Sequence, residues 1–234
     1  MLRFTLCMLL ACVSAVAFAA PHFQVTWPAA KCRAPQAPVA VIVPGYGLSG
    51  DDYTFLQAFL TQFGYGVVVY DGQIGRTTPL LLQSSPLAPQ LRWLADQTAR
   101  AVSDVLQQGQ TLYPQGDWHR VLLVGHSLGG DAAALLASWL PERISALITL
   151  DNRRVPLPVT EHFKVLSIRA TDTVADPGVL PSAQAIQGTS LQLVTLQGAH
   201  HNDMQDAGPE ALKQQIRAAL TGFLRANGLP ECHR

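Results

Sequence analysis

The 234-residue sequence lacks an excess of charge of either sign. Only 14% of its residues are charged, and 16 acidic side chains balance 16 basic ones. A chain without net charge has no strong field to attract nucleic acid or an anionic membrane surface. We therefore expect no nucleic-acid partner and no stable membrane partner.

Internal repeats, low-complexity tracts and an obvious linker are also lacking. No His/Cys/Asp/Glu group has the spacing of metal ligands, and no glycine-rich loop carries a phosphate-binding lysine. These absences predict that the protein uses no metal and no other cofactor. The length, with 48% hydrophobic residues, suits one domain with a sizeable buried core.

The first 20 residues differ from the rest of the chain. One early arginine precedes a long apolar run that ends in Ala-Phe-Ala at 17–19. This pattern predicts a secretory signal peptide over residues 1–20, and hence a periplasmic or secreted mature domain over 21–234. An uncleaved membrane anchor is one alternative, since the run has about the minimum length that spans a bilayer. A lipoprotein signal ending at Cys12 is another.

Cysteine is scarce, and removal of the signal peptide would leave only Cys32 and Cys232. An even number of cysteines in an exported chain predicts a disulfide, here one that joins the two ends of the domain. Two free thiols are the alternative.

Short apolar runs alternate with longer amphipathic segments along the rest of the sequence. Predicted strands occupy residues 39–45, 65–71, 120–125, 144–151, 163–170 and 191–198. Predicted helices occupy residues 51–64, 91–109, 128–140 and 208–228. The strands are continuously apolar, which indicates a mostly parallel sheet covered by helices on both faces, an α/β architecture. Ligands of such sheets bind beyond the carboxyl ends of the strands.

A Gly-His-Ser-Leu-Gly pentapeptide at 125–129 lies where a predicted strand passes into a predicted helix. Glycines flanking a serine permit a tight strand–turn–helix corner with the hydroxyl of Ser127 exposed. A glycine-rich turn that only packs a helix against a strand is the alternative. In this context the sequence resembles the α/β-hydrolase superfamily over nearly all of the mature chain. The resemblance implies an α/β-hydrolase fold.

That superfamily places a nucleophile, an acid and a histidine in this order after successive strands. The resemblance assigns Ser127 as the nucleophile. Residues 172–177, Asp-Thr-Val-Ala-Asp-Pro, resemble the acid loop, and Asp172 is the predicted acid, with Asp176 as the alternative. Residues 198–203, Gly-Ala-His-His-Asn-Asp, resemble the histidine loop, and His201 rather than His200 is the predicted base.

The resemblance further implies that the backbone N–H groups of Leu128 and Tyr46 form an oxyanion hole. The expected activity is hydrolysis of carboxylic esters through an acyl-enzyme on Ser127. The same triad would serve an amidase, a peptidase or an acyltransferase. A non-catalytic binding protein on a hydrolase fold is the alternative from another class.

The substrate is less determined. Only residues 152–163 follow the strand after which the superfamily usually inserts a lid, so we expect a minimal lid or none. Residues 72–89 would supply part of one wall of an open cleft. We expect a monomer that prefers short acyl esters, or esters on a bulky exposed surface. Arg153 and Arg154 would favour an acidic group on the substrate, or else form a solvated charge pair.

Overall fold

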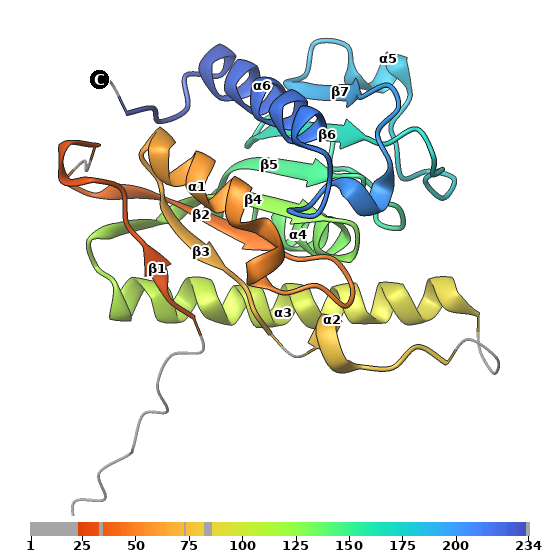
Figure 1. Ribbon diagram of the computed structural model, residues 1–234, viewed down its shortest axis with the longest axis horizontal. Helices are drawn as coiled ribbons and strands as arrows, with labels where there is room; N and C mark the ends of the chain where they lie inside the picture. Colours follow the sequence, from red (N-terminus) through yellow and green to blue (C-terminus); the bar gives the residue numbers. More distant parts are fainter. Residues whose placement is uncertain (1–22, 33–34, 73, 82–85, 233–234) are drawn as a thin grey trace, which may run out of the picture.

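A twisted sheet of seven strands forms the centre of the computed structural model, which describes residues 23–32, 35–72, 74–81 and 86–232 (Figure 1). The strands are β1 (Val25–Thr26), β2 (Ala37–Val43), β3 (Gly66–Val69), β4 (Gly116–His126), β5 (Ile144–Leu150), β6 (Lys164–Arg169) and β7 (Leu191–Thr195). Their order in the sheet is β1-β3-β2-β4-β5-β6-β7. The strands from β2 to β7 run parallel, and β1 pairs antiparallel with β3.

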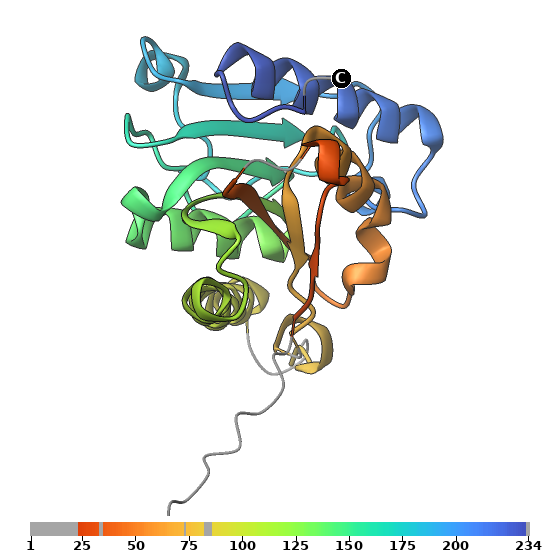
Figure 2. The same ribbon diagram turned by 90° about the vertical axis from the view of Figure 1, so that its left-hand side faces the viewer.

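Helices cover both faces of this sheet (Figures 1 and 2). The longer ones are α1 (Thr54–Phe63), α3 (Leu87–Leu112), α4 (Leu128–Trp139) and α6 (Glu210–Ala226). Helices α3 and α4 lie on one face, and α1 and α6 on the other. The short helices are α2 (Ile74–Thr77), α5 (Ala183–Ile186), η1 (Ala30–Cys32), η2 (Gly50–Tyr53), η3 (Pro141–Arg143) and η4 (His201–Asp203). The predicted fold class, a mostly parallel α/β sheet, is confirmed.

Alternate residues of β2 show why the strands read as continuously apolar. Val39, Val41 and Val43 pack in the core beneath α3 and α4, whereas Ala40 and Ile42 pack beneath α1 and α6. Successive side chains of a strand point to opposite faces of the sheet, so a strand covered on both faces needs apolar residues at every position.

Each predicted strand and long helix is present, with ends shifted by a few residues. The largest differences are that β4 and α3 both extend further than the sequence pattern indicates. Strand β1 is an addition, because two residues are too few to give a periodic pattern.

The carboxyl ends of the parallel strands meet at one edge of the sheet, as the arrowheads in Figure 1 show. Between β5 and β6 the structure has neither a helix nor a strand. The predicted absence of a lid domain at this position therefore agrees with the observed connection.

A disulfide joins Cys32 to Cys232, with their Cα atoms 5.0 Å apart, as predicted. The backbone N–H of Cys232 also donates to the carbonyl of Phe63, which holds the end of the chain against α1. The predicted signal peptide over residues 1–20, and Cys12 within it, lie outside the described residues. Within the described ranges no helix has the length and apolarity to cross a bilayer.

Candidate active site

Ser127 stands at the corner between β4 and α4. Its backbone has φ 54° and ψ −118°, a conformation that is strained for any residue with a side chain. Two hydrogen bonds hold the corner: the N–H of Ser127 donates to the Leu150 carbonyl, and its carbonyl accepts from the N–H of Asp131. The corner therefore presents the serine hydroxyl at the carboxyl edge of the sheet.

The glycines around Ser127 let the start of α4 approach the sheet closely. A Cβ atom on Gly129 would overlap the carbonyl oxygen of Val43, and one on Gly125 would overlap the carbonyl of Gly129. No side chain fits at either position, which is the steric reason predicted from the pentapeptide.

His201 reaches the serine from the connection between β7 and α6. Its Nε2 lies 2.8 Å from the Oγ of Ser127, within hydrogen-bonding distance. His201 is 9% exposed, whereas the side chain of the neighbouring His200 is 65% exposed. The structure therefore brings His201, and not His200, to the serine, as expected.

The acid is a correction to the sequence prediction. Asp151 Oδ2, not Asp172, lies 2.6 Å from the Nδ1 of His201. Asp172 is a third exposed: its Oδ1 accepts the backbone N–H of His201, and its Oδ2 lies 3.5 Å from His200 Nδ1. Asp172 thus braces the histidine loop but does not contact the imidazole of His201.

Asp151 reaches the imidazole because it directly follows β5, which neighbours β4 in the sheet, and because its own φ is 54°. Its carboxylate is fully buried. It accepts hydrogen bonds from the Thr173 hydroxyl (2.5 Å) and the Ala170 N–H (3.2 Å), and it pairs with Arg169 at 2.9 Å.

Burial alone would raise the pKa of Asp151. The hydrogen bonds from His201 and Thr173 and the charge of Arg169 outweigh this effect and lower the pKa to about 2. At neutral pH the group facing His201 Nδ1 is therefore a carboxylate.

A signal for Asp151 is present in the sequence. It is the last residue of the predicted strand 144–151, and an aspartate that ends a buried strand beside the strand of the nucleophile is unusual for a core position. Arg169, at the buried end of β6, is the matching cation.

Asp176, the alternative acid, lies away from the histidine. Its carboxylate pairs with Arg92 of α3 at 3.2 Å, and its N–H donates to the carbonyl of Arg153. It serves the packing of a surface loop.

Asp131 joins the serine corner to the loop that follows Asp151. It lies one helical turn after Ser127 and is buried, and its Oδ1 accepts the N–H groups of Arg153 (3.1 Å), Arg154 (2.8 Å) and Val155 (2.9 Å). Burial raises the pKa of Asp131, and the three N–H donors partly offset this effect. The predicted substrate contacts Arg153 and Arg154 are thus fixed by their backbone next to the acid.

The two predicted oxyanion donors lie on either side of the serine corner. Leu128 begins α4, and Tyr46 lies in the loop after β2. Within the described ranges neither backbone N–H donates a hydrogen bond. The Tyr46 hydroxyl donates to the carbonyl of Thr78 at 2.9 Å, which anchors the segment after α2.

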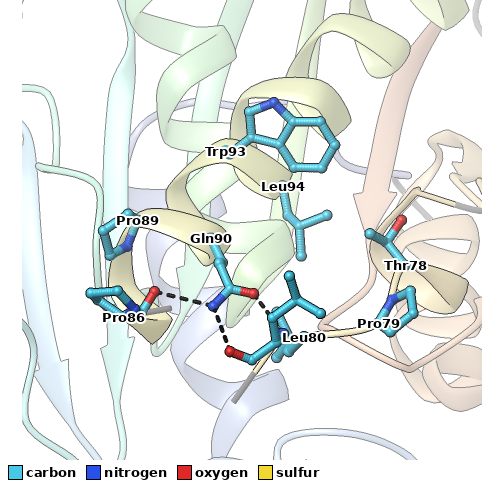
Figure 3. A pocket seen from close by; sticks show the side chains of 9 residues that line it. Thr78, Pro79, Leu80, Pro86, Pro89, Gln90, Trp93 and Leu94 are labelled. Carbon is cyan, nitrogen blue, oxygen red and sulfur yellow. Dashed lines mark hydrogen bonds between the residues drawn. The ribbon is translucent and has the colours of Figure 1, made fainter. Parts of the chain in front are cut away.

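That segment and the start of α3 line a groove of about 470 Å³ (Figure 3). Its walls are mainly apolar and consist of Thr78, Pro79, Leu80, Leu81, Pro86, Pro89, Gln90, Trp93 and Leu94. Gln90 links the two sides of the groove, because its amide binds the backbone N–H and C=O of Leu81 and the carbonyl of Pro86. Trp93 is 55% exposed and forms part of the wall. The volume suits a small organic ligand.

None of the described residues form a group of three or more potential ligands that could hold a metal ion. The arrangement of Ser127, His201 and Asp151 is that of a nucleophile, a base and an acid that orients the base.

Residues 34–151 match the protein family described as serine aminopeptidase, S33. This match extends from the segment before β2 to Asp151 and includes the serine corner. No curated protein sequence matches the chain.

Many solved structures share the fold. An esterase from Thermogutta terrifontis, solved after phosphorylation by paraoxon, has a TM-score of 0.63 at 17% identity, with 89% of each chain covered. An α/β-hydrolase from the sediment metagenome of the Mar Chica lagoon in Morocco has a TM-score of 0.59 at 13% identity, over 91% of this chain and 99% of the other. A serine hydrolase without a lid from Xanthomonas campestris has a TM-score of 0.51 at 18% identity, with 89% of each chain covered. At these identities the likeness concerns the fold.

Proposed function

Because the chain belongs to the serine aminopeptidase S33 family of the α/β-hydrolase superfamily, we propose that it is an exported serine hydrolase that cleaves carboxylic esters. The observation that carries this proposal is the continuous hydrogen-bonded series Ser127 Oγ, His201 Nε2, His201 Nδ1 and Asp151 Oδ2. Each member occupies the position that nucleophilic acyl transfer requires.

In the proposed reaction, His201 Nε2 takes the proton of Ser127 as the serine oxygen attacks the carbonyl carbon of the ester. The tetrahedral intermediate then collapses. The bond to the alcohol oxygen breaks, and His201 returns the proton to that oxygen. Water next attacks the acyl-enzyme, again giving a proton to His201, and the acid leaves as Ser127 regains the proton.

Asp151 acts on the imidazole throughout this cycle. As a buried carboxylate it accepts the Nδ1–H of His201, keeps the tautomer with a free Nε2 lone pair and stabilises the imidazolium that forms. The unpaired N–H groups of Tyr46 and Leu128 would stabilise the oxyanion. One such donor is typically worth about 3 kcal/mol in the transition state.

For the substrate we propose an ester with an apolar part small enough for an open site. The apolar groove that Trp93 lines also includes Thr78, whose carbonyl accepts the hydroxyl of Tyr46, so a lining residue contacts the residue of a proposed oxyanion donor. Arg153 and Arg154 would add a preference for an acidic group. The Nε atoms of both guanidinium groups are buried and have no hydrogen-bond partner within the described ranges.

A peptidase is the second candidate, and the description of the matching family favours it. Amides and esters share the acyl-enzyme chemistry, so the site geometry does not separate them. The likeness to a lidless serine hydrolase and to an esterase supports the hydrolysis of esters as the proposed activity.

The test is a panel of chromogenic esters and amides, varied in acyl length and in acidic substituents, given to the mature protein. We expect turnover of short acyl esters, one site labelled by a fluorophosphonate, and loss of both in Ser127→Ala without loss of the fold. Turnover of amides alone would favour the peptidase. A folded protein that is neither labelled nor active would favour a non-catalytic binding protein.

The groove has its own comparison within this panel. Trp93→Ala should lower kcat/KM for the most apolar esters by about tenfold, which corresponds to the burial of two CH₂ groups. Trp139→Ala is the matched control. Trp139, the last residue of α4, is also partly exposed, but it packs against Arg100 of α3 and does not line the groove. Equal effects of the two substitutions would exclude a substrate-binding role for the groove.

A further inference from the structure

Beneath the serine corner, three buried hydrogen bonds link the loop after β2 to the proposed base. The N–H of Gly45 donates to the hydroxyl of Tyr53 at 3.0 Å. That hydroxyl lies 2.7 Å from Nδ1 of His126, and Nε2 of His126 lies 2.9 Å from the backbone carbonyl of His201. Tyr53 and His126 are 0% and 3% exposed.

The chemistry of the partners sets the direction of each bond. The carbonyl of His201 can only accept, so Nε2 of His126 must carry a proton and donate it. Burial, followed by the neighbouring His201, lowers the pKa of His126 to about 4, so the ring is neutral at pH 7 and Nδ1 accepts. Burial raises the pKa of Tyr53, whose hydroxyl therefore stays protonated and donates to Nδ1. With these directions every donor in the series faces an acceptor.

Three residues of this series, Gly45, His126 and His201, belong to the three parts of the proposed reaction centre. Gly45 precedes Tyr46, whose N–H is a proposed oxyanion donor. His126 precedes Ser127. The His201 carbonyl belongs to the residue whose ring contacts Ser127. Since loops carry two of these parts, their relative position depends on contacts such as these rather than on a shared strand.

We propose that Tyr53 and His126 are positioning residues that hold the oxyanion loop and the base in register with Ser127. The proposal rests on the proposed acyl-transfer function. Neither side chain forms a hydrogen bond with the Ser127 hydroxyl or with the imidazole of His201, although the ring of His126 packs against that imidazole with the centroids 5.1 Å apart. They act through the backbone of Gly45 and His201.

The chain supplies a matched control for Tyr53. Tyr65 is also buried, at 1% exposed, but its hydroxyl has no hydrogen-bond partner within the described ranges. Tyr53→Phe and Tyr65→Phe therefore remove the same atom from similar depths, and only the first removes two hydrogen bonds.

Each variant is compared with wild type in kcat and KM for a short ester and in affinity for a trifluoromethyl ketone, which forms a tetrahedral adduct on the serine. Tyr53→Phe should lower kcat about tenfold, less than the loss of an oxyanion donor itself, with KM unchanged. The ketone should bind more weakly by a similar factor. Tyr65→Phe should leave all three values unchanged.

His126→Gln provides the second arm. With its amide nitrogen in the place of Nε2, glutamine can still donate to the His201 carbonyl, but it has no acceptor at the place of Nδ1, which faces the Tyr53 hydroxyl. If the two residues act as one series, Tyr53→Phe should cost clearly less in the His126→Gln background than in wild type.

Several outcomes would overturn the proposal. Tyr53→Phe could match Tyr65→Phe in kcat and ketone affinity, or it could lower only the melting temperature, which is what a purely structural role predicts. Full additivity with His126→Gln would also overturn it. A wild type that neither reacts with a fluorophosphonate nor hydrolyses any ester would instead end the proposed function, and this proposal with it.

Discussion

Ser127 and Asp151 are the two non-glycine residues with positive φ in the described part of the chain, both at 54°. They end the adjacent strands β4 and β5, and each is held by a backbone hydrogen bond to the next strand: Ser127 N–H to Leu150 and Asp151 N–H to Ile168. Such conformations typically cost about 1–3 kcal/mol each and persist where the surroundings determine them. Here the strained backbone turns both side chains toward His201.

The first prediction at this scale compares the two aspartates. Asp151→Asn should lower kcat by about 10⁴-fold, because an amide facing Nδ1 favours the wrong imidazole tautomer. Asp172→Asn should lower it by less than about tenfold, because its amide oxygen can still accept the His201 N–H. Steady-state kinetics with one ester measure both values, and circular dichroism checks the fold. A larger loss from Asp172→Asn than from Asp151→Asn would indicate that Asp172 is the acid, as the sequence predicted.

The second prediction concerns pH and His126. Its pKa is about 4 in the folded protein and about 6.5 when unfolded, so the unfolded chain binds more protons between these values. The free energy of unfolding should therefore fall as the pH drops from 6.5 toward 4. The loss from this group alone should reach about 2 kcal/mol by pH 5. Tyr53, His201 and Asp151 lie around this ring. The part of the change in unfolding free energy that does not come from His126 must therefore be measured separately.

The subtraction is made with His126→Gln, which keeps the same neighbours but cannot titrate. Urea unfolding of both proteins at pH 7 and pH 5 gives the two differences. The variant should lose about 2 kcal/mol less than wild type on acidification. Equal losses would mean that His126 is not buried in its neutral form.

At the scale of elements, Asp131 fastens α4 to the connection between β5 and β6. This connection contains no helix or strand, and three successive N–H groups at its start, those of residues 153–155, donate to one buried carboxylate oxygen. Asp131 lies one helical turn after Ser127, and its first partner lies two residues after Asp151. These hydrogen bonds therefore fix the distance between the ends of β4 and β5 at the reaction centre.

Asp131→Ala should therefore destabilise the protein by roughly 3 kcal/mol or more, because it leaves the N–H groups without a partner. Asp131→Asn should cost much less, since the amide oxygen can accept the same bonds. Chemical unfolding measures both free energies. If alanine and asparagine were equally tolerated, the carboxylate would not be holding the connection.

At the scale of the whole molecule, the disulfide closes nearly the entire domain into one loop. Cys32 and Cys232 are 200 residues apart, and the bond holds the segment before β2 beside the end that follows α6. Such a bond restricts the unfolded chain most when the loop is long.

Reduction, or the paired substitution of both cysteines by serine, should therefore lower the melting temperature. A loop of this length sets a ceiling on the order of 5 kcal/mol, and realised values are often smaller. Calorimetry of the oxidised and substituted proteins measures the change, and non-reducing peptide mapping of protein taken from the periplasm or the medium tests whether Cys32 is joined to Cys232. Recovery of both thiols in the free form from those sources would contradict the disulfide.

The sequence by itself predicted the architecture, and it pointed to Ser127 and His201, which the structure brings within hydrogen-bonding distance. Strands covered on both faces must be apolar at every position, and the glycines around Ser127 have no substitute at so tight a corner, so both leave local patterns. His201 was identified by the residues around it in the chain. The disulfide followed from the two cysteines that lie outside the predicted signal peptide.

The tertiary structure alone decided which aspartate faces the histidine and what supports the site. Asp151 and Asp172 both follow strands beside one another, and neither has a local pattern that shows where its carboxylate points. The choice depends on a left-handed backbone at Asp151 and on donors from Arg169 and Thr173, about 20 residues away. The Tyr53–His126 series likewise joins residues 73 positions apart. Such contacts depend on side-chain direction in three dimensions, which periodicity along a chain does not encode.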